Sequence, residues 1–153
     1  MPKPDKKFDM TIIGSGPGGY VCAVRAAQLG LSVAVVEKEP LPGGTCLHWG
    51  CIPTKAMLHS AEVLDTSRHA ADFGVKVDAP SVDMAGVQTY REATVQANAK
   101  GVQYLFKKNK VELIAGHGRL AGAGRVEITP ASGSPLTVES AAIVVATGSV
   151  IRG

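Results

Sequence analysis

An apolar strand pattern that runs directly into a glycine-rich turn is the feature that most constrains how this chain can fold. Residues 8–13 form a short apolar run, and residues 14–19 read Gly-Ser-Gly-Pro-Gly-Gly. Small apolar residues and good helix formers follow over residues 20–29, and a second apolar run covers residues 33–36. The order strand, helix, strand within forty residues predicts a β-α-β unit, and such a unit requires a parallel sheet.

The three glycines at positions 14, 16 and 19 fit the pattern G-x-G-x-x-G, and an acidic residue, Glu37, ends the next strand. Gly14 permits the tight turn, Gly16 lets the backbone approach a pyrophosphate, and Gly19 lets the helix pack against the sheet. The helix N-terminus supplies N–H groups and a favourable dipole to a phosphate. We expect Glu37 to accept hydrogen bonds from an adenosine ribose and to repel a 2′-phosphate. The motif predicts a dinucleotide site without separating FAD from NAD, and the alternative is a glycine-rich turn that binds nothing.

Length and composition limit the remaining possibilities. The chain has 153 residues with 45% hydrophobic and 19% charged residues, which suits one packed domain and excludes a disordered chain. No apolar run approaches the roughly 20 residues of a membrane span, so no membrane association is expected. The first ten residues resemble neither a signal peptide nor a transit peptide, which makes the cytoplasm the expected location.

The charge pattern gives no sign of a nucleic-acid partner. The net charge is +3, and the basic cluster at Lys107, Lys108 and Lys110 is typical of a solvated face. Aromatic residues make up 5% of the chain, which is too few for base stacking. We therefore expect no nucleic-acid binding.

Two long helices are predicted in the middle of the chain. The Pro/Gly-rich residues 39–44 cannot form regular structure. A helix is expected over about residues 52–69, with Pro53 tolerated in its first turn, and another from the N-cap Asp83 to residue 106. The core-facing positions of the second helix are predicted to be Val102, Leu105 and Phe106.

The last forty residues change to a period typical of strands. Residues 111–115, 125–129 and 136–138 are predicted to be short strands of a β-meander, and residues 143–146 a further buried strand. No internal repeat or long linker divides the chain. The predicted fold is therefore α/β, with a Rossmann-like parallel sheet, a nucleotide-binding β-α-β unit and a small β-meander.

Cys46 and Cys51 form the second chemically informative motif. In an ideal α-helix, positions i and i+5 have Cα atoms about 8.6 Å apart, which exceeds the roughly 7 Å that a disulfide allows. Gly50 and Pro53 flank the second cysteine, and a distorted first turn could bring the sulfurs together. Thiolates at a helix N-terminus are stabilised by its dipole, and Lys55 lies one turn further on. These are conditions for a reactive pair.

The position of the pair along the chain suggests its role. Nine residue steps separate Glu37 from Cys46, a maximum reach of about 30 Å, so this segment can run from the ribose end of a dinucleotide toward its far end. The dithiol would then lie beside a reactive ring, as expected for a flavin that exchanges electrons with a disulfide. Two alternatives stay open. Zinc could be held by Cys46, Cys51, His48 and His59, although the spacing matches no common zinc site. Inert thiols are the other alternative, and they describe Cys22 on the first helix better than they describe the pair.

Residues 43–55, Gly-Gly-Thr-Cys-Leu-His-Trp-Gly-Cys-Ile-Pro-Thr-Lys, closely resemble the redox-active segment of the flavin-dependent disulfide reductases. Residues 51–59 are most similar to the dihydrolipoamide dehydrogenase branch of that family, whereas glutathione and mercuric reductases more often carry Val-Pro after the second cysteine. The likeness extends over the whole chain, from residues 14–20 to residues 146–149. His48-Trp49 stands where Asn-Val is usual in the family.

The resemblance implies roles for individual residues. Cys46 would be the thiol that exchanges with the substrate, and Cys51 the thiol that faces the flavin. Lys55 would lie near the flavin N5, Thr45 along the pyrophosphate, and Gly118 at the adenine end. No metal ligand is expected. The cofactor-binding residues expected on this basis are Gly14, Gly16, Gly19, Glu37, Thr45, Lys55, Gly118, Thr147 and Gly148.

The resemblance also implies an activity, which is the oxidation of dihydrolipoamide through a Cys46–Cys51 disulfide and bound FAD with NAD+ as the final acceptor. The implied partners are the lipoyl domain of a 2-oxoacid dehydrogenase complex and, for the full-length form, a second copy in a homodimer. The family's second glycine motif, C-terminal His-Glu pair and later Gly-Asp segment are not found in residues 1–153. We therefore expect residues 1–153 to be the N-terminal portion of an FAD-binding domain, without NAD-binding and dimerisation domains and inactive alone. The alternatives are a non-catalytic flavin- or nucleotide-binding module and a reductase of the glutathione or mercuric type.

Overall fold

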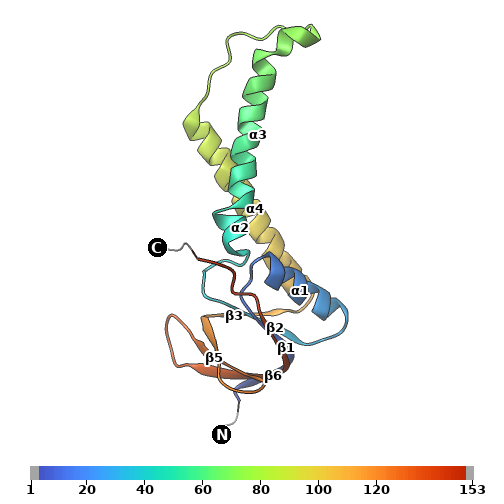
Figure 1. Cartoon of the computed structure of the whole chain (residues 1–153), viewed down its shortest axis with the longest axis vertical. Coiled ribbons are helices and arrows are strands. Elements are labelled where there is room, and N and C mark those ends of the chain that lie inside the picture. The colour runs from blue at the N-terminus through green and yellow to red at the C-terminus, as the bar shows by residue number, and fades with distance from the viewer. Residues whose placement is uncertain (1–3, 151–153) are drawn as a thin grey trace.

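The molecule is built on one six-stranded sheet of mixed direction, which lies at its lower end in Figure 1, in a computed structural model that describes residues 4–150. The strand order is β3-β2-β1-β6-β5-β4. Strands β3, β2, β1 and β6 are parallel, whereas β5 and β4 continue the sheet in antiparallel pairs. The predicted Rossmann-like α/β class is confirmed. The strands are β1 (Lys6–Ile13), β2 (Val33–Glu37), β3 (Glu112–Ala115), β4 (His117–Leu120), β5 (Arg125–Thr129) and β6 (Leu136–Val145).

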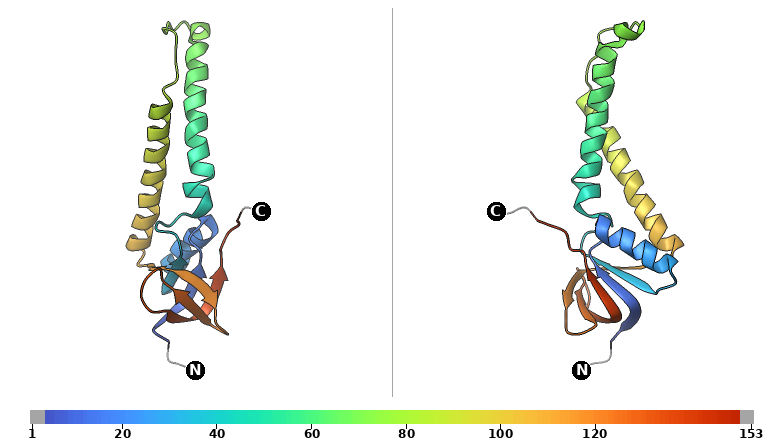
Figure 2. Two further views of the ribbon diagram at one scale, coloured as in Figure 1. Left: turned by 90° about the vertical axis from the view of Figure 1, so that its left-hand side faces the viewer. Right: turned by 45° about the vertical axis from the view of Figure 1, so that its right-hand side comes forward.

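The helices divide into those that cover the sheet and those that leave it. Helix α1 connects β1 to β2, and α4 packs its C-terminal part near α1. Helices α3 and α4 run side by side away from the end of the sheet as a long hairpin, with η1 at its tip (Figure 2). No helix within residues 4–150 is both long enough and apolar enough to cross a membrane. The helices are α1 (Pro17–Gln28), α2 (Gly44–His48), α3 (Cys51–Arg68), the 3-10 helix η1 (Ala70–Phe73) and α4 (Met84–Lys108).

Both faces of the parallel strands are buried, because alternate side chains of each strand enter different core clusters. Ile12, Val33 and Val35 pack with residues of α1 and α4. Ile13, Ala34 and Val36 pack on the other side with side chains of β3, β5 and β6. The whole of β2 is therefore buried, as its uninterrupted apolar sequence requires. The domain has three layers, with the parallel strands between the helices and the antiparallel strands.

The predictions for the last forty residues need three corrections. Residues 136–138 and 143–146 were predicted as separate strands, but they belong almost entirely to the single strand β6. The residues between them continue the strand because Ser140 is buried and shares a hydrogen bond with the Thr11 hydroxyl. Strand β4 was not predicted. The meander consists of β4, β5 and β6, whereas β3 pairs in parallel with β2 at the opposite edge.

The helix predictions are correct within three residues at each end, with two corrections in detail. Gly44, predicted to be irregular, is the first residue of α2, a short helix that the Pro/Gly composition concealed. Leu105 is 36% exposed rather than buried, since α4 meets the core through a narrow stripe formed by Ala99, Val102 and Phe106. The predicted N-cap is confirmed, because the Asp83 carboxylate accepts a hydrogen bond of 3.0 Å from the Ala85 N–H.

Candidate cofactor and redox site

The turn between β1 and α1 and the first turn of α1 each contain one position that admits only glycine. Gly14 has φ +101°, and a Cβ on it would lie 2.3 Å from the Ala146 carbonyl oxygen. A Cβ on Gly19 would lie 1.9 Å from the Gly14 carbonyl oxygen, so this glycine permits the close approach of helix to strand. The turn is fixed to the sheet by the Gly14 N–H, which donates a 2.8 Å hydrogen bond to the Val36 carbonyl.

The N-terminus of α1 is open to an anion. The N-cap residue Gly16 provides no side-chain cap for the first-turn N–H groups. Nothing lies within 4 Å of a Cβ built on Gly18, so the surface of the first turn is unobstructed. Uncapped N–H groups and the helix dipole together suit a pyrophosphate.

The Glu37 carboxylate lies at the end of β2, where it is only 7% exposed and is held by backbone donors. Its Oε2 accepts hydrogen bonds from the Ser15 N–H at 2.9 Å and from the Ser15 hydroxyl. Its Oε1 accepts a hydrogen bond of 2.9 Å from the Glu39 N–H. A carboxylate has about four acceptor positions, which leaves capacity for a further donor such as a ribose hydroxyl. Ser15 was not singled out in the sequence, although its place between two motif glycines could have indicated this role.

A second pair of glycines joins this cradle to the segment that carries the cysteines. The Gly43 N–H donates to the Ser15 carbonyl at 3.1 Å. Gly44 has φ +65°, and a Cβ on it would lie 2.6 Å from the Gly16 Cα. Thr45 follows as an exposed residue in the first turn of α2. The start of α2 is therefore packed directly against the glycine turn.

Cys46 and Cys51 are joined in a disulfide with a Cα–Cα distance of 4.7 Å. The bridge is possible because the chain between them is not one helix. Cys46 lies in α2, Cys51 is the first residue of α3, and Gly50 breaks the helical path with φ −123° and ψ −106°. A Cβ on Gly50 would lie 3.1 Å from the Thr45 carbonyl oxygen, which favours glycine at this break. Cys46 is half-buried and Cys51 is exposed, so the disulfide can be reached by another molecule.

The remaining predicted residues lie in different settings. Lys55 is exposed on α3, one turn after Cys51. Gly118 lies on β4, where a Cβ would come 3.1 Å from the Ile13 and Val36 side chains. The packing of the core therefore also favours glycine at this position. Thr147 follows β6, and its Cα would be 3.1 Å from a Cβ on Gly14. Gly148, the next residue, is exposed and has φ +73°.

Most of these residues thus lie at the carboxyl ends of β1, β2 and β6, and α2 connects this end of the sheet to the disulfide. The cofactor roles assigned to them remain predictions. Cys22, expected in the core, is half-buried against the cluster beneath α1.

The residues considered for zinc have other interactions. Cys46 and Cys51 bond to each other, the His48 Nε2 lies 3.2 Å from the Pro42 carbonyl oxygen, and the His59 Nδ1 lies 3.4 Å from the Glu62 carboxylate. Within residues 4–150, no three His, Cys, Asp or Glu side chains are grouped so that they could hold a metal ion.

Comparison with known proteins identifies relatives over nearly the whole chain. The family model described as pyridine nucleotide-disulphide oxidoreductase matches residues 8–152. Dihydrolipoyl dehydrogenase 3 of Pseudomonas putida is 44% identical over 146 residues, which are 94% of this chain and 31% of the relative. Dihydrolipoyl dehydrogenase of Bacillus subtilis is 53% identical over 116 residues, which are 76% of this chain and 24% of the relative. Leghemoglobin reductase of Vigna unguiculata is 41% identical over 145 residues, which are 94% of this chain and 28% of the relative.

The chain spans less than a third of the length of these relatives. Its fold, its glycine cradle and its adjacent disulfide agree with the family match. The chain belongs to the pyridine nucleotide-disulphide oxidoreductase family.

Proposed function

We propose that this chain is the FAD-binding and dithiol-exchanging part of a dihydrolipoyl dehydrogenase, which oxidises dihydrolipoamide and uses NAD+ as the final acceptor. The observation that carries the proposal is the Cys46–Cys51 disulfide, held through α2 against a glycine cradle suited to a dinucleotide. Relatives named dihydrolipoyl dehydrogenase, at 44% and 53% identity, favour this activity over that of a glutathione or mercuric reductase.

The residues of the cradle fit FAD. The open N-terminus of α1 and the bare backbone at Gly16 would hold the pyrophosphate, and Thr45 would lie along it. Glu37 retains acceptor capacity for the adenosine ribose, and Lys55 is the side chain assigned to the flavin ring. Gly118 would contact the adenine, and Thr147 with Gly148 would complete the cradle. FAD, when bound, would accept two electrons from the reduced cysteines and supply a hydride to NAD+.

The chemistry of the cysteines is thiol–disulfide exchange. A substrate thiolate attacks the Cys46 Sγ, forms a mixed disulfide and releases Cys51 as a thiolate. The second substrate thiol then attacks the substrate sulfur of the mixed disulfide. This step releases Cys46 as a thiolate and closes the substrate into a cyclic disulfide. The substrate loses two electrons and two protons, and the cysteine pair gains them. The exposed Cys51 at the N-terminus of α3 lies where the helix dipole stabilises a thiolate.

The proposed partners follow from the same assignment. The dihydrolipoyl group would arrive on the lipoyl domain of a 2-oxoacid dehydrogenase complex. NAD+ would be the co-substrate of a longer form of the enzyme, which would act as a homodimer.

The purified 153-residue chain can test the proposal. We expect it to bind one equivalent of FAD. In a separate experiment without FAD, dihydrolipoamide should yield two new titratable protein thiols and one equivalent of lipoamide. The variant Cys46→Ser should yield no lipoamide, whereas Cys22→Ser should react as the unchanged chain does. A disulfide that dithiothreitol reduces but dihydrolipoamide does not would contradict the proposed substrate, and absence of FAD binding would contradict the proposed cofactor.

A further inference from the structure

An aromatic pair, His48 and Trp49, stands in the sequence between the two cysteines of the disulfide. Trp49, the single tryptophan of the sequence, is 63% exposed. Its ring and that of His48 have centroids 5.4 Å apart and planes inclined by 51°. The His48 imidazole is itself anchored, because its Nε2 lies 3.2 Å from the Pro42 carbonyl oxygen.

The two rings form one wall of a shallow hollow of about 180 Å³. The lining is almost entirely apolar or aromatic and carries a single carboxylate. A neutral apolar group therefore suits this hollow, and an anionic group would be repelled by the carboxylate. The lining residues are Glu39, Pro40, Leu41, His48 and Trp49.

The hollow lies within reach of the reacting sulfurs. Trp49 is the C-cap of α2, and its backbone N–H donates a 2.9 Å hydrogen bond to the Thr45 carbonyl, so this residue follows Cys46 by about one turn. Two residue steps separate Trp49 from Cys51, so their Cα atoms are at most about 7.6 Å apart. A hydrocarbon chain of several carbons is long enough to span this separation between the Cα atoms.

We propose that this hollow binds the hydrocarbon chain of a neutral dithiol substrate and selects it against short or anionic thiols. The inference rests on the proposed dithiol exchange, and it specifies which feature of the substrate the protein recognises. Trp49 and His48 would be specificity-determining residues, since they contact the chain of the substrate and not its sulfurs. Each methylene removed from water favours association by about fourfold, so a partly covered chain of four methylenes gives about a tenfold preference.

The test compares two dithiols with the same spacing of sulfur atoms. Dihydrolipoamide and 1,3-propanedithiol both close into a five-membered cyclic disulfide, but only the first carries the chain. The rate of Cys46–Cys51 reduction is measured for each dithiol by counting protein thiols against time. The rate with dihydrolipoamide is divided by the rate with 1,3-propanedithiol, and this ratio is compared between variants. We expect Trp49→Ala to lower that ratio about tenfold and to leave the rate with 1,3-propanedithiol unchanged.

The matched control is Phe73→Ala, which removes a ring that is 78% exposed on η1, at the far tip of the hairpin (Figure 1). This variant should leave the ratio unchanged. Equal ratios in Trp49→Ala and in the unchanged chain would overturn the proposal. Failure of every dithiol to reduce the pair would instead contradict the proposed function itself.

A second measurement uses a probe without sulfur. Octanamide, a neutral eight-carbon amide, should change the fluorescence of Trp49 in a saturable way and should slow the reaction of dihydrolipoamide but not that of 1,3-propanedithiol. Equal inhibition of both dithiols, or faster reduction by the anionic glutathione than by dihydrolipoamide, would show that the hollow does not select a neutral chain.

Discussion

Two adjacent glycines in the first turn of α1 differ sharply in the room that surrounds them. A Cβ on Gly19 would lie 1.9 Å from a backbone oxygen that cannot move without the turn, whereas a Cβ on Gly18 meets nothing within 4 Å. We expect Gly19→Ala to lower the free energy of unfolding by at least about 1–3 kcal/mol, the usual range for an overpacked position, and to weaken FAD binding. Gly18→Ala should leave stability within about 0.5 kcal/mol of its original value. Urea unfolding of both variants checks this, and equal effects would contradict it.

At the same scale, the sequence predicts those residues that a known motif records. Gly14 and Gly19 were found from the G-x-G-x-x-G spacing, although Gly14 also packs against the carbonyl oxygen of Ala146, 132 positions later. Gly44 is required because it packs against Gly16, a residue 28 positions earlier, and no local pattern reports such a contact. Ser15 was overlooked although it stands between two motif glycines, because its hydrogen bond to Glu37 joins two different strand ends.

The elements that escaped prediction are those whose local composition disagrees with their tertiary setting. Strand β4 contains Gly118 and reads as a turn, but it pairs with β5 and needs a small residue against Ile13 and Val36. The middle of β6 carries polar residues, yet each is matched by a neighbouring strand. By contrast, β2 and α1 were predicted closely, because their apolar patterns match the positions that are buried.

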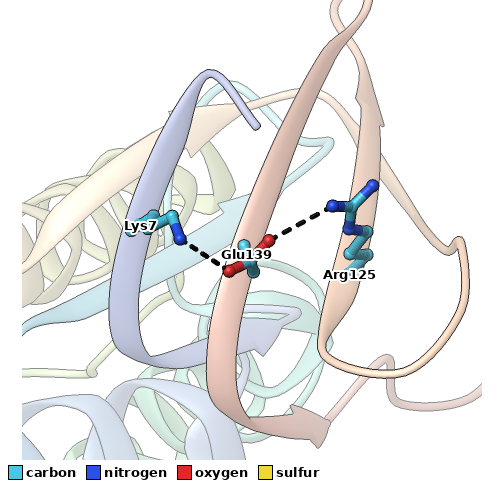
Figure 3. Close-up of polar contacts among 3 residues, drawn as sticks. All are labelled: Lys7, Arg125 and Glu139. Carbon is cyan, nitrogen blue, oxygen red and sulfur yellow. Dashed lines mark hydrogen bonds and ion pairs between the residues drawn. The ribbon is translucent and has the colours of Figure 1, made fainter. Parts of the chain in front are cut away.

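Figure 3 shows how one of these polar residues is matched. Glu139 of β6 lies in register with Lys7 on β1 and with Arg125 on β5. Its carboxylate accepts hydrogen bonds of 2.8 Å from Lys7 and 3.3 Å from Arg125. The hydrogen bond from Lys7, helped by the charges of Lys7 and Arg125, lowers the pKa of Glu139 below its usual 4.5, and desolvation opposes the shift. The row of charges spans the junction between the parallel and antiparallel parts of the sheet.

This row of charges predicts a pH dependence of stability. A carboxyl whose pKa is lower in the folded chain than in the unfolded chain stabilises the fold fully above the unfolded pKa. That contribution is lost as the pH falls through the lower, folded pKa. Asp9, whose pKa is lowered from 3.8 mainly by a hydrogen bond from the Ser32 hydroxyl, acts in the same direction. We therefore expect stability to decrease as the pH falls below about 4.5.

Urea unfolding between about pH 3 and pH 6 measures the effect. Glu139→Gln should make the decrease shallower, because the neutral amide has no proton to gain. Asp78→Asn, which removes a carboxyl from the exposed loop between η1 and α4, is the control and should leave the slope unchanged. Identical slopes in all three proteins would contradict the role of Glu139.

At the scale of the whole molecule, the packed sheet and the projecting hairpin differ in how much they bury. In α3 the buried residues are Pro53 and Ala56, and in α4 they are Ala99, Val102 and Phe106, which lie in the half of each helix nearer the sheet (Figure 1). The distal turns of both helices contain no buried residue. Local opening of such turns is expected to need far less free energy than opening of the strands.

Hydrogen exchange followed by mass spectrometry tests this difference. We expect backbone amides of residues 60–68 and 84–92 to exchange at least about 100 times faster than those of β1 and β2. Cooperative exchange of the hairpin and the sheet at a single rate would contradict it.

The two strands that pair with β1 are synthesised at very different times. Strand β1 pairs with β2, which follows it within about forty residues, and with β6, whose Glu139 lies 132 positions after Lys7. During synthesis on the ribosome, one edge of β1 must therefore stay unpaired until the chain 132 residues further on has emerged. The β-α-β unit can assemble early, but the antiparallel layer and the second core cluster cannot close over it until β6 is complete. The order of translation thus leaves the central strand of the finished domain as a temporary sheet edge, shielded at its start by the charges of Lys6 and Lys7.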